Sequence, residues 1–147
     1  MSNKVLISVV VDTDKLVSEF PKGGKVENRG LIVMSDNQPD SSYTDSHGGL
    51  YKDKLHTMVD WDDDMIWTIS ALNGKDKLVF SKCDGPTLTD LLTGMPQADA
   101  SDKAKWNAKV KNKLTAKYKP WYTFYFHLKN DDTNIWFWDP SEENRIP

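Results

Sequence analysis

Apolar and polar residues alternate through the last third of the chain. Every odd position from 105 to 119 is polar, and the even positions are apolar except Asn112. Four apolar residues in this stretch also recur at every fourth position: Trp106, Val110, Leu114 and Tyr118. That spacing drifts around a helix of 3.6 residues per turn, whereas alternation matches a pleated strand. The pattern therefore predicts a strand over residues 105–119, interrupted by Pro120.

Other segments predict further strands. Their ranges are 5–11, 31–34, 65–72, 78–81, 121–128 and 135–138. The first is nearly continuous in apolar residues, which favours a strand covered on both faces. Asn73-Gly74 predicts a hairpin turn, and residues 131–134 predict another turn before a last strand that stops at Asp139-Pro140.

Helical signals are few. Residues 12–20 favour a short helical turn before Pro21, and Thr87-Leu-Thr-Asp90 resembles a capping box with Gly94 at the helix end. Nine of the 16 aromatic residues lie between Tyr118 and Trp138, which favours a sheet-rich core there. We therefore expect an all-β, jelly-roll-like β-sandwich with one short helix near residues 87–93, forming a single domain over 1–147.

The composition indicates the cellular compartment of the protein. The single cysteine, Cys83, has no internal disulfide partner, which fits a reducing cytosol. The apolar stretch 5–11 is too short for a signal peptide and is followed at once by Asp12, and no run of 18 apolar residues predicts a membrane span. The sequence thus predicts a cytoplasmic protein.

Acidic residues are densest at Asp60, Asp62, Asp63 and Asp64. Calcium prefers such oxygens, but a calcium loop starting at Asp60 would have Met65 in place of its glycine and Ala71 in place of its closing glutamate. We favour a solvated turn between strands, and whether the cluster binds calcium stays open. The histidines are too scattered to predict a metal site. The pattern predicts no catalytic residue, no metal and no cofactor, and hence no enzyme.

Lysines dominate residues 103–119. Seven lysines occur there with no acid, which leaves a net charge of −10 on the rest of a chain whose total is −3. Such a basic stretch could attract nucleic acid, but lysines on an outer strand face also serve to keep a sheet edge from pairing with other chains. We favour this second explanation, so nucleic acid is not the favoured partner. A basic face can instead bind the acidic remainder of another copy. The predicted self-association residues are Lys105, Lys109, Lys111, Lys113 and Lys117.

Six tryptophans allow a second interpretation. Trp136 and Trp138 share one strand face and either lie in the core or join Trp121 in a platform for sugar stacking. Asp60 and Asp62 would then supply polar contacts. The predicted ligand-binding residues of this carbohydrate-binding alternative are Trp121, Trp136, Trp138, Asp60 and Asp62.

Several motifs in order resemble the inclusion body protein family, also called the AidA/PixA family. They are Val11-Asp12-Thr-Asp14 with Leu16 and Phe20-Pro21, then Asp64-Met-Ile-Trp67-Thr-Ile-Ser70, then Tyr122-Thr-Phe-Tyr-Phe126 and Trp138-Asp139-Pro140. The resemblance implies a bacterial, non-enzymatic β-sandwich linked to intracellular inclusions and to stress, quorum or host-associated states. It carries over no catalytic residues. Together with the lysines, it leads us to expect a non-catalytic accessory protein that self-associates as a homo-oligomer.

Overall fold

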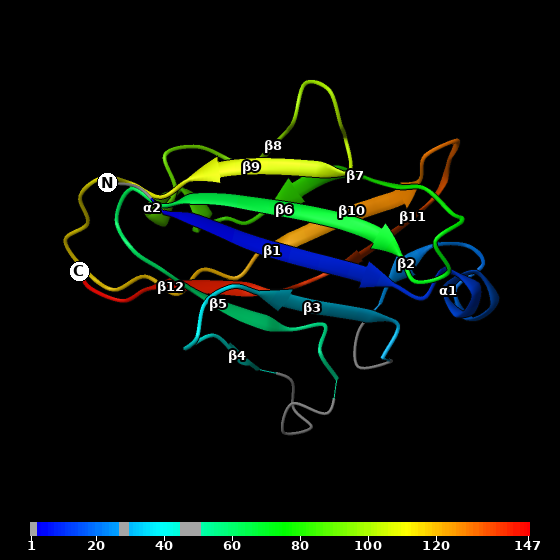
Figure 1. The fold of residues 1–147 in the computed structure, drawn as a ribbon, viewed down its shortest axis with the longest axis horizontal. Helices are drawn as coiled ribbons and strands as arrows, with labels where there is room; N and C mark the ends of the chain where they lie inside the picture. The colour runs from blue at the N-terminus through cyan, green and yellow to red at the C-terminus, as the bar shows by residue number, and fades with distance from the viewer. Residues whose placement is uncertain (1–2, 27–29, 45–50) are drawn as a thin grey trace.

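The computed structural model describes residues 3–26, 30–44 and 51–147 and arranges them as stacked β-sheets (Figure 1). The largest sheet has five strands in the order β3-β1-β6-β9-β8. Their bounds are β1 Lys4–Val11, β3 Ile32–Asp36, β6 Asp64–Ala71, β8 Gln97–Ala98 and β9 Lys105–Lys109. β1 and β6 run parallel at the centre of this sheet, and β3 and β9 flank them antiparallel.

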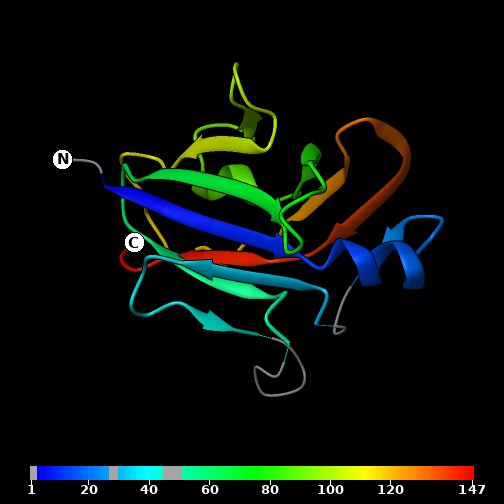
Figure 2. The same cartoon turned by 45° about the vertical axis from the view of Figure 1, so that its right-hand side comes forward.

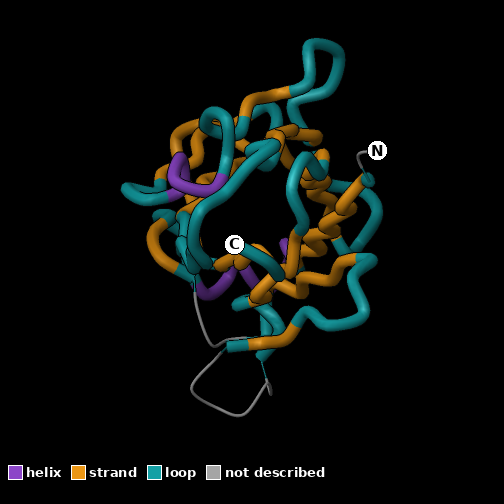
Figure 3. Tube along the Cα trace, turned by 90° about the vertical axis from the view of Figure 1, so that its left-hand side faces the viewer, coloured by secondary structure: helices purple, strands orange, loops and turns teal. Residues whose placement is uncertain are grey.

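Two smaller sheets complete the fold. One has the order β2-β11-β10-β7 and the other the order β12-β5-β4. Their bounds are β2 Gly24–Lys25, β7 Leu78–Asp84, β10 Thr123–Leu128 and β11 Asp131–Trp138, then β4 Ser42–Tyr43, β5 Leu55–Val59 and β12 Ser141–Asn144. Figure 2 shows β5 and β4 continuing beyond β3, and Figure 3 looks along the long axis from the end that holds the C-terminus. The all-β fold predicted from the sequence is confirmed.

The core lies between the sheets and is strongly aromatic. Trp67 of β6 packs edge-on against Phe124 of β10, with ring centroids 5.5 Å apart. Phe80 of β7 lies 4.3 Å from the same Phe124 ring, and Trp138 of β11 stacks on it at 6.2 Å. Such pairs add stabilisation to the large apolar area that each ring buries. Five of the aromatic residues near the C-terminus therefore lie in the core: Tyr122, Phe124, Phe126, Trp136 and Trp138.

The strand predicted over 105–119 is correct only for its first five residues. β9 ends at Lys109 because its partner β6 begins at Asp64, the residue opposite Lys109. Beyond that point the backbone is held by loops, since the N–H of Val110 donates to the carbonyl of Asp63 and that of Lys111 to Leu91. Leu114 is still buried, but through a loop rather than a strand.

Other predicted elements change in detail. β1 alternates instead of being covered on both faces, and Leu6 is 48% exposed. The turn at Asn73-Gly74 exists, but β6 and β7 belong to different sheets, so no hairpin forms. The Asn73 side chain accepts bonds from the N–H groups of Lys75 and Asp76 and donates to Thr13, which ties the turn to the N-terminal helix.

The described chain has two helices, not one. α1 spans Thr13–Glu19 and is capped by Asp12, whose Oδ1 accepts a hydrogen bond from the N–H of Lys15. α2 spans Leu88–Leu91, inside the predicted 87–93, but Thr87 forms no side-chain cap. At the C-terminus the predicted turn 131–134 is wrong, because β11 already begins at Asp131, and β12 follows the proline that was expected to end the last strand.

Candidate functional site

The lysines predicted for self-association lie in two environments. Lys109 forms ion pairs with Asp62 and Asp64, at Nζ–O distances of 3.4 and 3.2 Å. Its pKa is raised, first by the hydrogen bond to Asp64 and then by that to Asp62. Lys109 is therefore already paired with aspartates of its own chain, and its role in self-association stays a prediction. The other four form no ion pair with any described residue: Lys105, Lys111, Lys113 and Lys117.

The acidic cluster lies at the turn between β5 and β6, as expected, but Asp64 is the first residue of β6 and Asp63 is buried rather than solvated. Asp60 pairs with the guanidinium of Arg145 at 2.8 Å. Asp63 is buried, and its Oδ2 accepts a hydrogen bond from the N–H of Asp60 at 2.8 Å, while burial raises its pKa. Within the described ranges no three acidic, histidine or cysteine side chains are grouped to hold a metal ion. The cluster instead neutralises nearby cations.

Two of the three tryptophans predicted to stack on a ligand are inaccessible. Trp136 is 2% exposed and its Nε1 donates to the carbonyl of Phe20 at 2.8 Å. Trp138 is fully buried, with its Nε1 3.2 Å from the sulfur of Met34. Their ring faces pack in the core, so they offer no ligand platform. Trp121 is 54% exposed, so its ring remains accessible to a ligand, as the prediction requires.

A second aromatic group lies on the outer face of the sheet that contains β10 and β11. The sequence analysis did not predict it. Tyr125 and Phe137 face one another with centroids 5.1 Å apart, and Lys82 lies 5.2 Å from the Tyr125 ring. They line a shallow hollow of about 320 Å³ with Ser81 and Ile135. The alternation in 121–128 and 135–138 could have shown that these side chains point away from Phe124 and Trp138.

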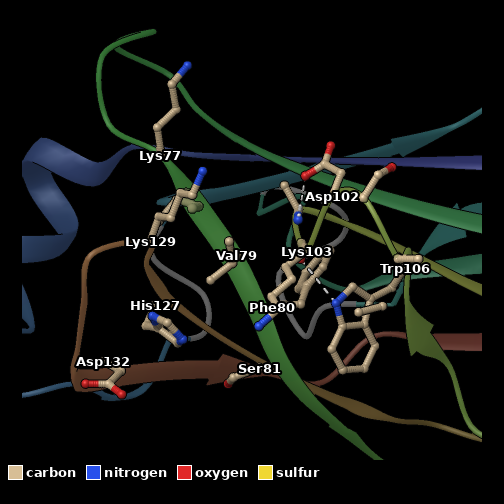
Figure 4. A pocket seen from close by; sticks show the side chains of 15 residues that line it. Lys77, Val79, Phe80, Ser81, Asp102, Lys103, Trp106, His127, Lys129 and Asp132 are labelled. Carbon is tan, nitrogen blue, oxygen red and sulfur yellow. Dashed lines mark hydrogen bonds between the residues drawn. The ribbon is translucent and has the colours of Figure 1, made fainter.

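A larger hollow than this one was not predicted either. It has a volume of about 840 Å³ and lies where the edge strand β7 meets residues 98–104, which run from the end of β8 to the start of β9 (Figure 4). Its lining combines apolar residues of β7 with Lys77, Lys103, Lys129 and His127. These residues come from three segments far apart in the sequence, so no local motif could have identified them.

The core also contains a carboxyl group to which no described residue donates a hydrogen bond. Glu142 of β12 is fully buried, and neither of its carboxyl oxygens has a donor among the described residues. Burial raises the pKa of Glu142 to about 8. Burial is also the main cause of the raised pKa values of Tyr122 and Cys83, and the charge of Glu142 adds to both. Tyr122 accepts a hydrogen bond from Trp67 at 3.1 Å. The thiol is thus held neutral and unreactive in the interior.

Stacked, mostly antiparallel sheets around an aromatic core define this protein as a β-sandwich. No described helix is long and apolar enough to cross a membrane. The chain belongs to a family described as "Domain of unknown function (DUF8788)", whose model matches residues 3–134. No curated protein matches it.

A solved structure supports the sequence resemblance. The chain superimposes on the inclusion body protein PixA from Burkholderia cenocepacia J2315 with a TM-score of 0.65, covering 98% of this chain and 96% of that one. The sequence identity is 10%, so the likeness is one of fold. The resemblance to the PixA type of protein is confirmed at that level.

Proposed function

We propose that this chain is a non-catalytic protein that assembles with copies of itself. The observation that supports this most is the fold shared, over nearly the whole chain, with a protein described as an inclusion body protein. Self-assembly is the property that such a name implies, and a bacterial cytoplasm is the compartment in which we place it. The buried, neutral thiol of Cys83 is compatible with that compartment.

The lysine-rich loop after β9 is the contact we assign to one side of the assembly. Lys111, Lys113 and Lys117 form no ion pair with the described part of the chain, and the last two are exposed. Lys109 is left out because Asp62 and Asp64 already bind it. Acidic groups such as Glu19, which is exposed on α1 at the opposite end of the molecule, supply the complementary side (Figure 1). Contacts of this kind generate open chains of copies.

Light scattering across ionic strength tests the proposal. Between about 0.02 and about 1 M salt the range of electrostatic attraction falls from roughly 20 Å to roughly 3 Å, so the mean assembly mass should decrease. The variant Lys111→Glu, Lys113→Glu, Lys117→Glu should remain monomeric at low salt.

A matched control changes the same charge elsewhere. Lys15, Lys22 and Lys75 are exposed at the α1 end of the molecule, and their reversal to Glu should leave assembly through the loop intact. A native chain that is monomeric at every ionic strength overturns the proposal. Equal assembly by the loop variant and the native chain overturns the assignment of the loop.

A further inference from the structure

The hollow beside β7 has an apolar floor. Val79 and Phe80 of β7 and Trp106 of β9 line it, and these three side chains are 8%, 2% and 9% exposed. β7 is the edge strand of its sheet, and the hollow opens between that edge and the neighbouring loop 98–104. Its volume of about 840 Å³ is within the range of roughly 300–1,000 Å³ that is usual for small-molecule sites.

The rim of the hollow is cationic. Lys77 precedes β7, Lys103 precedes β9 and Lys129 follows β10, so three separate segments bring ammonium groups to one opening. All three are exposed, and none forms an ion pair with a described residue. Elsewhere Lys25, Lys82 and Lys109 are paired with aspartates.

Two aspartates also line the hollow, Asp102 and Asp132. Asp102 is occupied in part, since its Oδ1 accepts a hydrogen bond from the N–H of Ala104 at 2.9 Å. Three lysines against two aspartates leave the lining with a net positive charge. An anion is therefore attracted to the site, and a cation is not.

Backbone hydrogen bonds hold the walls in place. The carbonyl of Lys103 accepts from the N–H of Phe80 and from Nε1 of Trp106, both at 3.2 Å. The N–H of Lys129 donates to the carbonyl of Lys77 at 2.8 Å. Figure 4 shows Lys129 and His127 on one side of β7 and Lys103 with Trp106 on the other. The backbone that carries the three lysines is thus held in place before any ligand arrives, which lowers the entropic cost of binding.

His127 adds a hydrogen-bonding side chain to the rim. Its Nδ1 lies 2.6 Å from the carbonyl oxygen of Leu128, and a carbonyl can only accept, so Nδ1 carries the proton. In the neutral ring Nε2 is then an acceptor on the rim.

We propose that this hollow binds a small amphipathic organic anion. Its apolar or aromatic body lies against Val79, Phe80 and Trp106, and its carboxylate or phosphate group lies among the ammonium groups of Lys77, Lys103 and Lys129. An inorganic anion would leave the apolar floor uncovered, and an uncharged ring would leave the ammonium groups unpaired. The site does not depend on the proposed assembly.

Calorimetric titration with four probes tests this binding. The probes are 2-naphthoate, 1-naphthyl phosphate, the uncharged 2-naphthamide and inorganic phosphate. We expect one-to-one binding of one or both naphthyl anions, at least about tenfold tighter than of the amide or of inorganic phosphate. The tighter of the two anions identifies the preferred head group. Amide NMR shifts should be confined to residues 77–81, 98–106 and 127–132.

Charge removal locates the site. The variant Lys77→Gln, Lys103→Gln, Lys129→Gln should weaken binding of the better naphthyl anion by at least about tenfold, and high salt should weaken it in the native chain. The control Lys15→Gln, Lys22→Gln, Lys113→Gln removes the same charge at exposed positions outside the hollow and should change binding less than twofold. No saturable binding, equal binding of the amide, or equal loss in both variants overturns the proposal.

Discussion

Glu142 makes the stability of this protein depend on pH in an unusual direction. Its buried carboxyl has no hydrogen-bond donor in the described part of the chain, and burial raises its pKa from an ordinary value near 4.5 to about 8. The folded state therefore binds this proton more tightly than the unfolded chain does. The stability contributed by the neutral carboxyl is complete below about pH 4.5, falls as the pH rises to about 8, and is constant above that value.

The size of the effect follows from the shift. Each pKa unit corresponds to about 1.4 kcal/mol, so full ionisation of Glu142 would reduce the free energy of unfolding by roughly 5 kcal/mol. At pH 7 the loss would be roughly 3 kcal/mol. Such a loss is a large fraction of the roughly 5–15 kcal/mol that stabilises a typical domain.

The variant Glu142→Gln separates this ionisation from every other titration. Urea unfolding, followed by tryptophan fluorescence between pH 5 and pH 9, should show the variant within about 1–2 kcal/mol of the native chain at pH 5 and more stable by several kcal/mol at pH 9. The exposed control Glu19→Gln should give no such trend. A stability difference between Glu142→Gln and the native chain that is independent of pH would refute the reasoning. If the Gln variant does not fold, Glu142→Met serves the same comparison.

Two further outcomes follow from the side-chain contacts. Arg145 forms ion pairs with Asp40 at 2.7 Å and with Asp60 at 2.8 Å, and a lysine cannot bind both carboxylates in this geometry. Arg145→Lys should therefore lower the free energy of unfolding, measured by urea titration, by about 1–2 kcal/mol, and unchanged stability would contradict this reasoning. Cys83 is 9% exposed and its pKa is raised. Its reaction with a thiol reagent should therefore be limited by the rate at which the protein unfolds locally, and it should accelerate in urea. Fast modification of the native protein would show instead that the thiol is accessible.

The sequence predicts best where a strand's side-chain pattern depends on its own neighbours. The range 65–72 matches β6 to within one residue, and 78–81 lies inside β7. The alternation after residue 109 is misleading, because a strand also needs a partner and β6 provides none beyond Asp64. The short polar strand β12 gives no apolar signal of its own, and it forms because β5 lies beside it.

The candidate sites were harder to predict for the same reason. The burial of Trp136 and Trp138 was one of two open interpretations, and the packing against Phe20 and Met34 decides it. The hollow beside β7 joins residues of the segments near 77, 103 and 129, which only the folded chain brings together. Lys103 belonged to the lysine-rich stretch in the sequence, but its neighbours in space were not apparent there.

The place of β12 in the fold bears on how the chain is made. Residues 141–144 pair in parallel with β5, which is synthesised about eighty residues earlier. Arg145 then forms ion pairs with Asp40 and Asp60 in two earlier loops. Until residues 141–144 leave the ribosome, β5 lacks its parallel neighbour in the sheet. Nascent chains paused before residue 141 would therefore be the species that binds chaperones and aggregates most readily during translation.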